Sequence, residues 1–211
     1  MTTDKTLICR ITHYKNLEGI LKRGGIYASN FQPNDGIKFY PIHHVDIQNQ
    51  RSVINVPCGP GGSIHDYVPY YFGPRSPMLF AISKNKVEEY NEGQQPVIYI
   101  CAYAEDIKDK GLDFVFTDGH AIMAITRFFD DLKDLDKLYW DIIEGKYWFD
   151  SEQYPDRCRR RQAEFLVHKF FPLDCVFEIV VIDKHIQKKV NSVLAKHDID
   201  IPVVVKKNWY Y

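Results

Sequence analysis

The chain lacks the cysteine spacing and the long apolar run that define several common classes of protein. Paired Cys-x-x-Cys spacing is absent, so a structural zinc site built on paired thiolates is not expected. No stretch reaches 18 uncharged apolar residues, so we expect no membrane contact, and Met1–Lys5 lacks the apolar core of a signal peptide. We interpret the five cysteines as small core residues in a reducing cytoplasm: Cys9, Cys58, Cys101, Cys158 and Cys175.

An excess of one charge is also missing. Lysine plus arginine number 27 and aspartate plus glutamate 28, which gives a net charge of −1. Bulk charge therefore does not mark a nucleic-acid binder, and any such contact must come from a local patch. Hydrophobic residues make up 45% of the 211 positions and aromatics 14%, which excludes wholesale disorder and predicts one well-packed domain over 1–211.

Regular alternation of strands and helices is absent, and no Gly-x-Gly-x-x-Gly follows a strand, so a Rossmann site is not supported. The glycines around 59–62 lack the Lys-Ser/Thr of a phosphate-binding loop. The mixed order of elements predicts an α+β fold. We expect strands over 6–12, 67–72, 96–104, 114–116, 164–171, 176–182 and 201–205, and helices from 13 to Gly24, over 42–53, from Pro77, over 121–138 and over 185–196.

The densest positive charge in the chain lies in the segment 157–167, where one glutamate then enters an apolar strand. Extended spacing predicts that Gln162 and Glu164 share a face. One interpretation is a solvated basic loop before a glutamate at the mouth of a strand. The other is a carboxylate held rigidly to bind a hydroxyl or stabilise positive charge, beside cations that attract phosphates. The cations are Arg157, Arg159, Arg160 and Arg161.

Three other segments carry polar side chains with alternative interpretations. Thr12-His13-Tyr14 lies where a strand passes into a helix, so it could bind a ligand or simply cap and pack. Arg51 precedes an aromatic-rich stretch and could hold a phosphate or a base, or could be an exposed helix end. His120 follows a turn and is either a substrate contact or a loop residue. A metal phosphohydrolase built on His43, His65 and Asp66 is a weaker possibility.

Taken together, these segments resemble the DarT-type DNA ADP-ribosyltransferase toxins. The order and spacing of the matching strings over almost the whole chain carry the resemblance. The strings are Ile11-Thr12-His13, Asn16–Leu21, Ile47-Gln48 with Arg51, Gly61–Pro69, Pro74–Leu79, Phe114–Asp118 with His120, and Arg161–Val167.

The resemblance implies an ADP-ribosyltransferase (PARP-like) fold: a split, mostly antiparallel sheet flanked by helices, with NAD⁺ in the cleft and no metal. It implies that Glu164 is catalytic and that Arg51 is its partner. Because an arginine is a poor base at neutral pH, we expect His120 or Glu164 to be the catalytic group that accepts the proton of the base. Residues 34–53 would cover NAD⁺, and residues 120–164 would form the substrate-recognition loop. The implied NAD⁺-binding residues are Thr12, His13, Tyr14, Asn16, Leu21, Ser29 and Arg51.

The implied activity is transfer of ADP-ribose to a base of single-stranded DNA, with thymine favoured, in the cytoplasm of a bacterium. This would be a replication-blocking toxin opposed by a DarG-type macrodomain antitoxin. Rival interpretations are an ADP-ribosyltransferase acting on protein or RNA, and a non-catalytic nucleic-acid-binding module. The DNA contacts expected are Arg157, Arg159, Arg160, Arg161, Gln162, Tyr147 and Trp148.

Overall fold

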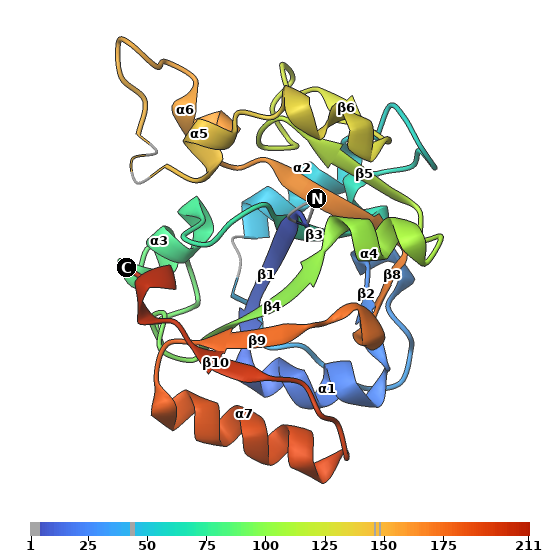
Figure 1. Cartoon of the computed structure of the whole chain (residues 1–211), viewed down its shortest axis with the longest axis vertical. Coiled ribbons are helices and arrows are strands. Elements are labelled where there is room, and N and C mark those ends of the chain that lie inside the picture. The colour runs from blue at the N-terminus through green and yellow to red at the C-terminus, as the bar shows by residue number, and fades with distance from the viewer. Residues whose placement is uncertain (1–4, 43–44, 146, 148) are drawn as a thin grey trace.

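The computed structural model describes residues 5–42, 45–145, 147 and 149–211 (Figure 1). The strands are β1 Leu7–His13, β2 Gly25–Tyr27, β3 Tyr67–Tyr71, β4 Val97–Tyr103, β5 Phe114–Thr117, β6 Phe128–Phe129, β7 Glu164–His168, β8 Phe170–Pro172, β9 Glu178–Val181 and β10 Val203–Val205. The helices are α1 Leu17–Lys22, α2 Val45–Val53, α3 Pro77–Ser83, α4 Ala104–Asp109, α5 Trp140–Ile143, α6 Arg157–Arg160 and α7 Lys184–Lys196.

The main sheet is split near its middle. Its order is β10-β9-β4-β1-β3-β7-β5-β6, and its pairs are antiparallel except β10 with β9. β1 pairs with β4 from Leu7 to His13, whereas among the described residues it meets β3 only where Cys9 faces Tyr71. The strands β1 and β3 therefore diverge on both sides of this contact. The predicted split, mostly antiparallel sheet is confirmed.

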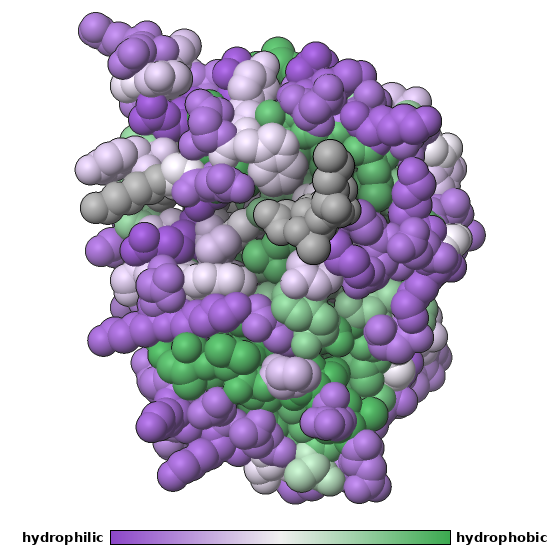
Figure 2. Space-filling view, viewed as in Figure 1, coloured by the Kyte–Doolittle hydropathy of each residue, from purple (hydrophilic) through white to green (hydrophobic). Residues whose placement is uncertain are grey.

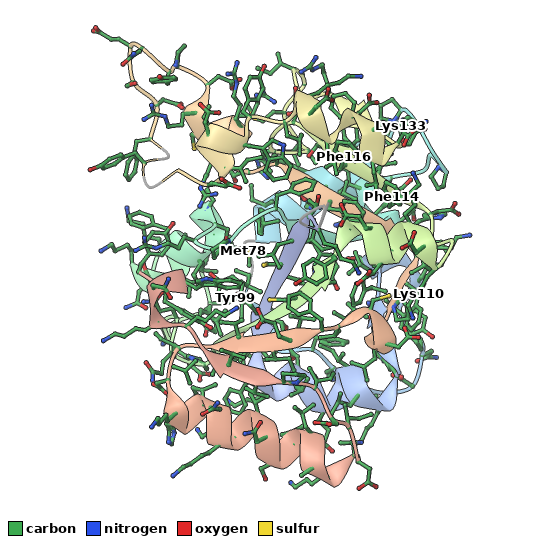
Figure 3. All side chains as sticks on the ribbon, in the orientation of Figure 1. Met78, Tyr99, Lys110, Phe114, Phe116 and Lys133 are labelled. Atoms are coloured by element: carbon green, nitrogen blue, oxygen red, sulfur yellow. The ribbon has the colours of Figure 1, made fainter. Side chains whose placement is uncertain are left out.

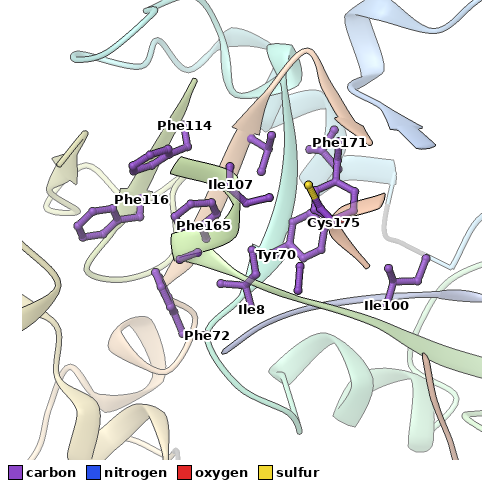
Figure 4. Packing of buried hydrophobic residues seen from close by; sticks show 14 of the residues in the cluster. Ile8, Tyr70, Phe72, Ile100, Ile107, Phe114, Phe116, Phe165, Phe171 and Cys175 are labelled. Carbon is purple, nitrogen blue, oxygen red and sulfur yellow. The ribbon is translucent and has the colours of Figure 1, made fainter. Parts of the chain in front are cut away.

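The largest hydrophobic core lies against the half of the sheet that contains β3, β7 and β5. Aromatic rings meet edge-on or stacked there, for example Phe72 with Phe165 at 6.0 Å and Phe114 with Phe165 at 4.9 Å (Figure 4). Burying each such side chain contributes about 1.5–3 kcal/mol. Figure 3 shows Phe114 and Phe116 on β5, and Lys133 beyond them with a side chain that is 84% exposed.

The second half of the sheet is covered by α7. Asp183 accepts hydrogen bonds from the backbone N–H groups of His185 and Ile186, which fixes the start of this helix. Ile186, Val190 and Leu194 recur at helical spacing and are buried. Figure 2 shows an apolar band at the level of β9 and β10 on an otherwise largely hydrophilic face. Within the described part of the chain, no helix is long and apolar enough to cross a membrane.

The helix predicted over 121–138 is wrong. The segment forms turns, then β6 paired with β5, then a 3-10 helix over Leu132–Lys137. Side-chain hydrogen bonds fix these turns in place of a helix: Thr126 Oγ1 donates to the His120 carbonyl (2.8 Å), and Asp118 accepts from Arg127 N and Nε (3.0 and 2.8 Å).

The single strand predicted over 164–171 is wrong: Lys169 has a φ of 60°, and the chain divides there into β7 of the main sheet and β8, which pairs with β2 in a separate sheet. The remaining predicted elements are present, with their ends shifted by a few residues. Ser76 caps α3, and Pro77 occupies the first helical position, as predicted. The helix predicted over 42–53 is observed from Val45 onward, and residues 43–44 lie outside the described residues. Pro69 is tolerated inside β3 because β1 has already diverged there, so that side of β3 behaves as an edge.

Candidate active site

Glu164 is the first residue of β7 and faces Tyr71 of β3 across the ladder. Its backbone N–H donates to Thr117 Oγ1 (3.0 Å), and that hydroxyl donates to the Gly119 carbonyl (2.7 Å). The side chain is buried. Because both its strand and its backbone N–H are fixed, the carboxylate has a defined position at the mouth of the strand.

Arg51 of α2 reaches this carboxylate from 113 residues away. Its Nη1 lies 2.9 Å from Oε2 and 3.1 Å from Oε1 of Glu164, and Ala121 N donates to Oε1 at 3.1 Å. Both side chains are buried, and a buried ion pair gives little net stability after desolvation. Arg51 Nη2 is buried without a hydrogen-bond partner, which leaves a cationic donor for a ligand.

A second guanidinium lies near this pair. Arg10 of β1 donates from Nη1 to the Pro69 carbonyl (3.0 Å), and no carboxylate among the described residues pairs with it. Burial lowers the pKa of Arg10, and the neighbouring charge of Arg51 lowers it further. Burial raises the pKa of Tyr71, as does the charge of Glu164. Two guanidiniums against one carboxylate suit an anionic ligand such as the diphosphate of NAD⁺.

His120 lies beside Glu164 and Arg51. Its backbone N–H donates to the Arg159 carbonyl (3.0 Å), and its own carbonyl accepts from Thr126. Burial lowers the pKa of His120, the charge of Glu164 opposes this, and Arg51 adds to it. The imidazole is therefore neutral at neutral pH, the form that can accept a proton.

The strand–helix junction predicted to bind NAD⁺ is covered by the segment around Tyr40. Asn16 donates to the Tyr40 carbonyl (2.9 Å) and accepts from Tyr40 N (2.6 Å). The Tyr40 ring lies 4.4 Å from the His13 ring, centroid to centroid. His13 Nδ1 accepts from Lys15 N (3.2 Å), and Nε2 lies 3.5 Å from a carboxylate oxygen of Glu92. In this arrangement the His13 side chain is enclosed, so Thr12 and Tyr14 flank a closed junction.

The two less specific NAD⁺-binding assignments lie in different surroundings. Leu21 is buried in the core between α1 and α7, and Ser29 is an exposed residue that begins the 3-10 turn Ser29–Phe31. Neither side chain forms a hydrogen bond with Glu164 or Arg51 in the structure.

The interpretation of the basic segment as one solvated run is wrong for two of its arginines. Arg159 is buried and pairs with Asp118 (2.8 Å) and Asp156 (2.6 Å), so its charge is used within the fold. Arg161 is buried and donates to the Pro74 carbonyl (2.8 Å). Both guanidiniums are buried, so neither is freely exposed to solvent.

The other two arginines of this segment, Arg157 and Arg160, are partly exposed. The guanidinium of Arg157 lies 4.2 Å from the Tyr154 ring centroid, and that of Arg160 lies 3.7 Å from Tyr139 and pairs with Asp156. Gln162 lies in a turn and donates to the Cys158 carbonyl (3.2 Å). The segment is therefore not extended at Gln162, and the prediction that Gln162 and Glu164 share a face of one strand is wrong. Tyr147 is exposed, whereas Trp148 lies outside the described residues.

The described residues contain no group of three or more His, Cys, Asp or Glu that could hold a metal ion. Of the suggested phosphohydrolase residues, Asp66 accepts hydrogen bonds from Asn30 and Ser63, and His43 lies outside the described residues. Arg10 and Tyr71 were missed from the sequence. Arg10 could have been identified from the sequence, because it is the one arginine or lysine within the otherwise largely apolar strand Leu7–His13.

The split, mostly antiparallel sheet and the buried Glu164–Arg51 pair agree with the ADP-ribosyltransferase class that the sequence resemblance implies. The family model described as "ssDNA thymidine ADP-ribosyltransferase, DarT" matches residues 9–211. A DNA ADP-ribosyl transferase of Thermus aquaticus is 42% identical over 209 residues, which is 98% of this chain and 89% of that protein. The chain belongs to the DarT family of NAD⁺-dependent DNA ADP-ribosyltransferases.

Solved structures agree with this assignment and with the predicted ADP-ribosyltransferase fold. Thermus sp. 2.9 DarT in complex with ADP-ribosylated ssDNA is similar with a TM-score of 0.92 and 40% identity, covering 99% of this chain and 97% of that one. The same enzyme in complex with NAD⁺ gives a TM-score of 0.87 and 37% identity, with 100% of both chains covered.

Proposed function

We propose that this chain transfers ADP-ribose from NAD⁺ to a thymine base of single-stranded DNA and acts as the toxin of a toxin–antitoxin pair. The observation that carries the proposal is the buried Glu164 carboxylate, held by Arg51 and by Ala121 N at the split of the sheet. Membership of the family supports DNA as the acceptor and thymine as the base.

In the reaction, NAD⁺ supplies the ADP-ribosyl group and nicotinamide leaves. The bond from ribose C1″ to the nicotinamide nitrogen breaks, and a bond from C1″ to a ring nitrogen of the base forms. Positive charge develops on the ribose as the first bond breaks. Glu164 stabilises this charge and accepts a hydrogen bond from a ribose hydroxyl, because its carboxylate is already oriented.

The base must also lose a proton from the attacking nitrogen. Arg51 is a poor acceptor because a guanidinium has a pKa above about 12. Its role in the proposal is to orient Glu164 through Nη1 and to bind an anion or the base edge through Nη2. His120 is neutral and close to Glu164, so we propose that His120 accepts the proton from the base.

The acceptor strand must present an unpaired base, because a stacked and paired base hides its imino nitrogen. In the proposal, Arg157 and Arg160 meet backbone phosphates, and Tyr147 provides a stacking face. Residues 120–164 form the recognition segment, and residues 34–53 cover NAD⁺, where the hydrogen bonds between Asn16 and Tyr40 hold part of that cover.

Bulky ADP-ribose on template bases would block replication, so the toxin needs an opposing activity. We propose a DarG-type macrodomain antitoxin that removes the modification, and a cytoplasmic site of action where DNA and NAD⁺ are both present. A neighbouring gene that encodes a macrodomain protein would agree with this part of the proposal.

The test is intact-mass spectrometry of thymine-containing single-stranded oligonucleotides incubated with the protein and NAD⁺. A gain of one ADP-ribose mass is expected, and Glu164→Ala should reduce the rate by about 10²–10³. Oligonucleotides that lack thymine test the choice of base. NAD⁺ consumption without DNA modification would favour a protein or RNA acceptor. DNA retention without NAD⁺ consumption would favour a non-catalytic binding module.

A further inference from the structure

A cavity of about 660 Å³ lies outside the Glu164–Arg51 site. Three parts of the chain line it: residues 5–7, which lead into β1; residues 72–75, which follow β3; and residues 140 and 143–145 around α5, together with Arg161. Figure 1 shows α5 in the upper half of the molecule. Glu164, Arg51 and His120 do not line this cavity.

The cavity contains a buried cation without an anionic partner. Arg161 is 8% exposed; its Nη2 donates to the Pro74 carbonyl, and its Nε has no hydrogen-bond partner. Nη1 lies 3.7 Å from the position that a Cβ on Gly73 would take, so the absent side chain leaves room in front of the guanidinium. Among the described residues, no carboxylate lies within ion-pair distance of Arg161.

The other charged groups at the cavity do not neutralise Arg161. Arg75 adds a second guanidinium; its Nε donates to the Tyr210 carbonyl (3.2 Å) and it lies over the Tyr211 ring. Lys5 is already paired with Asp106. Glu144 lines the cavity but forms no ion pair with either arginine in the described part of the chain. A buried guanidinium without a counter-charge is unfavourable, so the cavity suits an anion.

An aromatic wall accompanies the two arginines. Trp140 donates from Nε1 to the Leu135 carbonyl (2.8 Å), and its ring packs edge-on against Phe72 at 5.6 Å. The indole is therefore fixed in orientation where it lines the cavity. Guanidiniums beside a rigid aromatic ring form the combination that binds a phosphate and a base of a single nucleic-acid strand.

The position of the cavity connects it with the acceptor. Arg161 lies three residues before Glu164, and Gly73 lies two residues after Tyr71, which faces Glu164. Trp140 and Arg161 both belong to the segment 120–164 that we propose recognises DNA. We propose that this Arg161 cavity binds a nucleotide of the DNA acceptor next to the one that reacts, with its phosphodiester on Arg161 and Arg75 and its base against Trp140. The inference rests on the proposed DNA acceptor.

The first experiment measures KM and kcat of the wild-type protein on a set of thymine-containing oligonucleotides. Each member carries one neutral methylphosphonate linkage at a different position near the reactive base. We expect one linkage outside the reactive nucleotide to raise KM by about tenfold, as for the loss of a charge-assisted hydrogen bond. If the wild-type protein modifies none of the unsubstituted DNA, the proposed function itself is wrong, and the cavity proposal falls with it.

The second experiment repeats the series with Arg161→Met. Its KM on unsubstituted DNA should rise by a similar factor, and the sensitive linkage should then have no further effect. Gly73→Ala provides an independent variant if Arg161→Met does not fold, because the added methyl contacts Nη1 at an ordinary distance and narrows the approach. Lys188→Met is the matched control; it removes one positive charge from the exposed face of α7 and should leave the profile of linkage effects unchanged.

Three results would overturn the inference while transfer to DNA remains intact: equal KM values for every linkage in the wild-type protein, a linkage effect that persists undiminished in both cavity variants, or the same loss in Lys188→Met. Inorganic phosphate and thymidine monophosphate are added as competitors in a separate arm. Inhibition that depends on Arg161 without any linkage effect would assign the cavity to a free anion and reject the DNA strand as its occupant.

Discussion

Replacing Arg159 by methionine is expected to destabilise the fold, because this arginine holds together the segment that carries His120. Its Nη1 donates to Asp118 Oδ1 (2.8 Å) and to Thr126 Oγ1 (3.2 Å), and its Nε and Nη2 both reach Asp156 (2.8 and 2.6 Å). The Arg159 carbonyl also accepts from His120 N (3.0 Å). Asp118 is only 3% exposed, so it cannot regain water when the guanidinium is removed.

The size of the effect follows from these contacts. Removing one partner of a buried ion pair costs about 3–5 kcal/mol. Asp118 keeps its bonds to Arg127, so we expect a loss near the lower limit, about 3 kcal/mol. For a chain of this size, that lowers Tm by about 6–12 °C. Arg157 is only partly buried and contacts the Tyr154 ring, so Arg157→Met should cost less than about 1 kcal/mol.

The assay is thermal unfolding followed by circular dichroism at neutral pH for Arg159→Met, Arg157→Met, Asp118→Asn and the double variant Asp118→Asn/Arg159→Met. Because Asp118→Asn removes the charge that Arg159 neutralises, the double variant should lose less stability than the sum of the single variants. A Tm for Arg159→Met within 2 °C of the wild type, together with weakened DNA binding, would refute the reasoning and restore Arg159 as a DNA contact.

Four further predictions concern the reaction, the stability of the fold and the binding of DNA. Arg51→Lys removes the guanidinium whose Nη1 contacts both oxygens of Glu164 and whose Nη2 is left for a ligand, and it should lower the transfer rate by about 10²-fold in the oligonucleotide mass assay, with the fold retained. Undiminished transfer would contradict the orienting role. Burial lowers the pKa of His120 below its ordinary 6.5, so kcat/KM should be level above neutral pH and fall on acidification with a pKa under 6.5, and His120→Gln should abolish this acid limb. Burial also lowers the pKa of His13 and His65, so the unfolded chain takes up protons first: stability should be fully present above about pH 6.5 and decline as pH falls through the lower folded pKa values, which a Tm series between pH 7 and 5 measures. If Arg157 and Arg160 meet phosphates, DNA affinity should fall steeply with salt, and each Arg→Met variant should reduce the salt slope by about 1; an unchanged slope would remove them from the interface.

The sequence predicts the strands of this fold better than its irregular segments. The strand over Val97–Tyr103 is buried almost throughout, so a continuous apolar run identifies it. In 121–138, by contrast, the apolar residues serve turns and a two-residue strand, and the bonds that specify these come from Thr126 and Asp118. Such side-chain-to-backbone bonds leave no periodic signal in the sequence.

The candidate site shows the same limit. From the residues alone, Glu164 has two interpretations, a solvated residue at the start of a strand or a catalytic carboxylate. The sequence does not decide between them because the partner of Glu164, Arg51, lies 113 positions away. Only the resemblance to a family brought the two together before the structure did. The prediction that the arginines of 157–161 form one solvated run is wrong for a related reason. Asp118, which neutralises Arg159, lies in a loop 41 residues earlier in the chain. The local sequence does not show which charges are paired in the fold.

The position of β4 in the sheet has a consequence for synthesis on the ribosome. β4 is buried at every position but its last and lies between β1 and β9, where Tyr99 faces Val180. In the growing chain, one edge of β4 therefore stays uncovered until β9 has emerged, and Glu164 cannot meet Arg51 until β7 pairs with β3. A chain stalled before residue 164 lacks the Glu164 carboxylate and exposes an unpaired apolar edge, so we expect an incomplete copy to be inactive as a transferase and prone to aggregate.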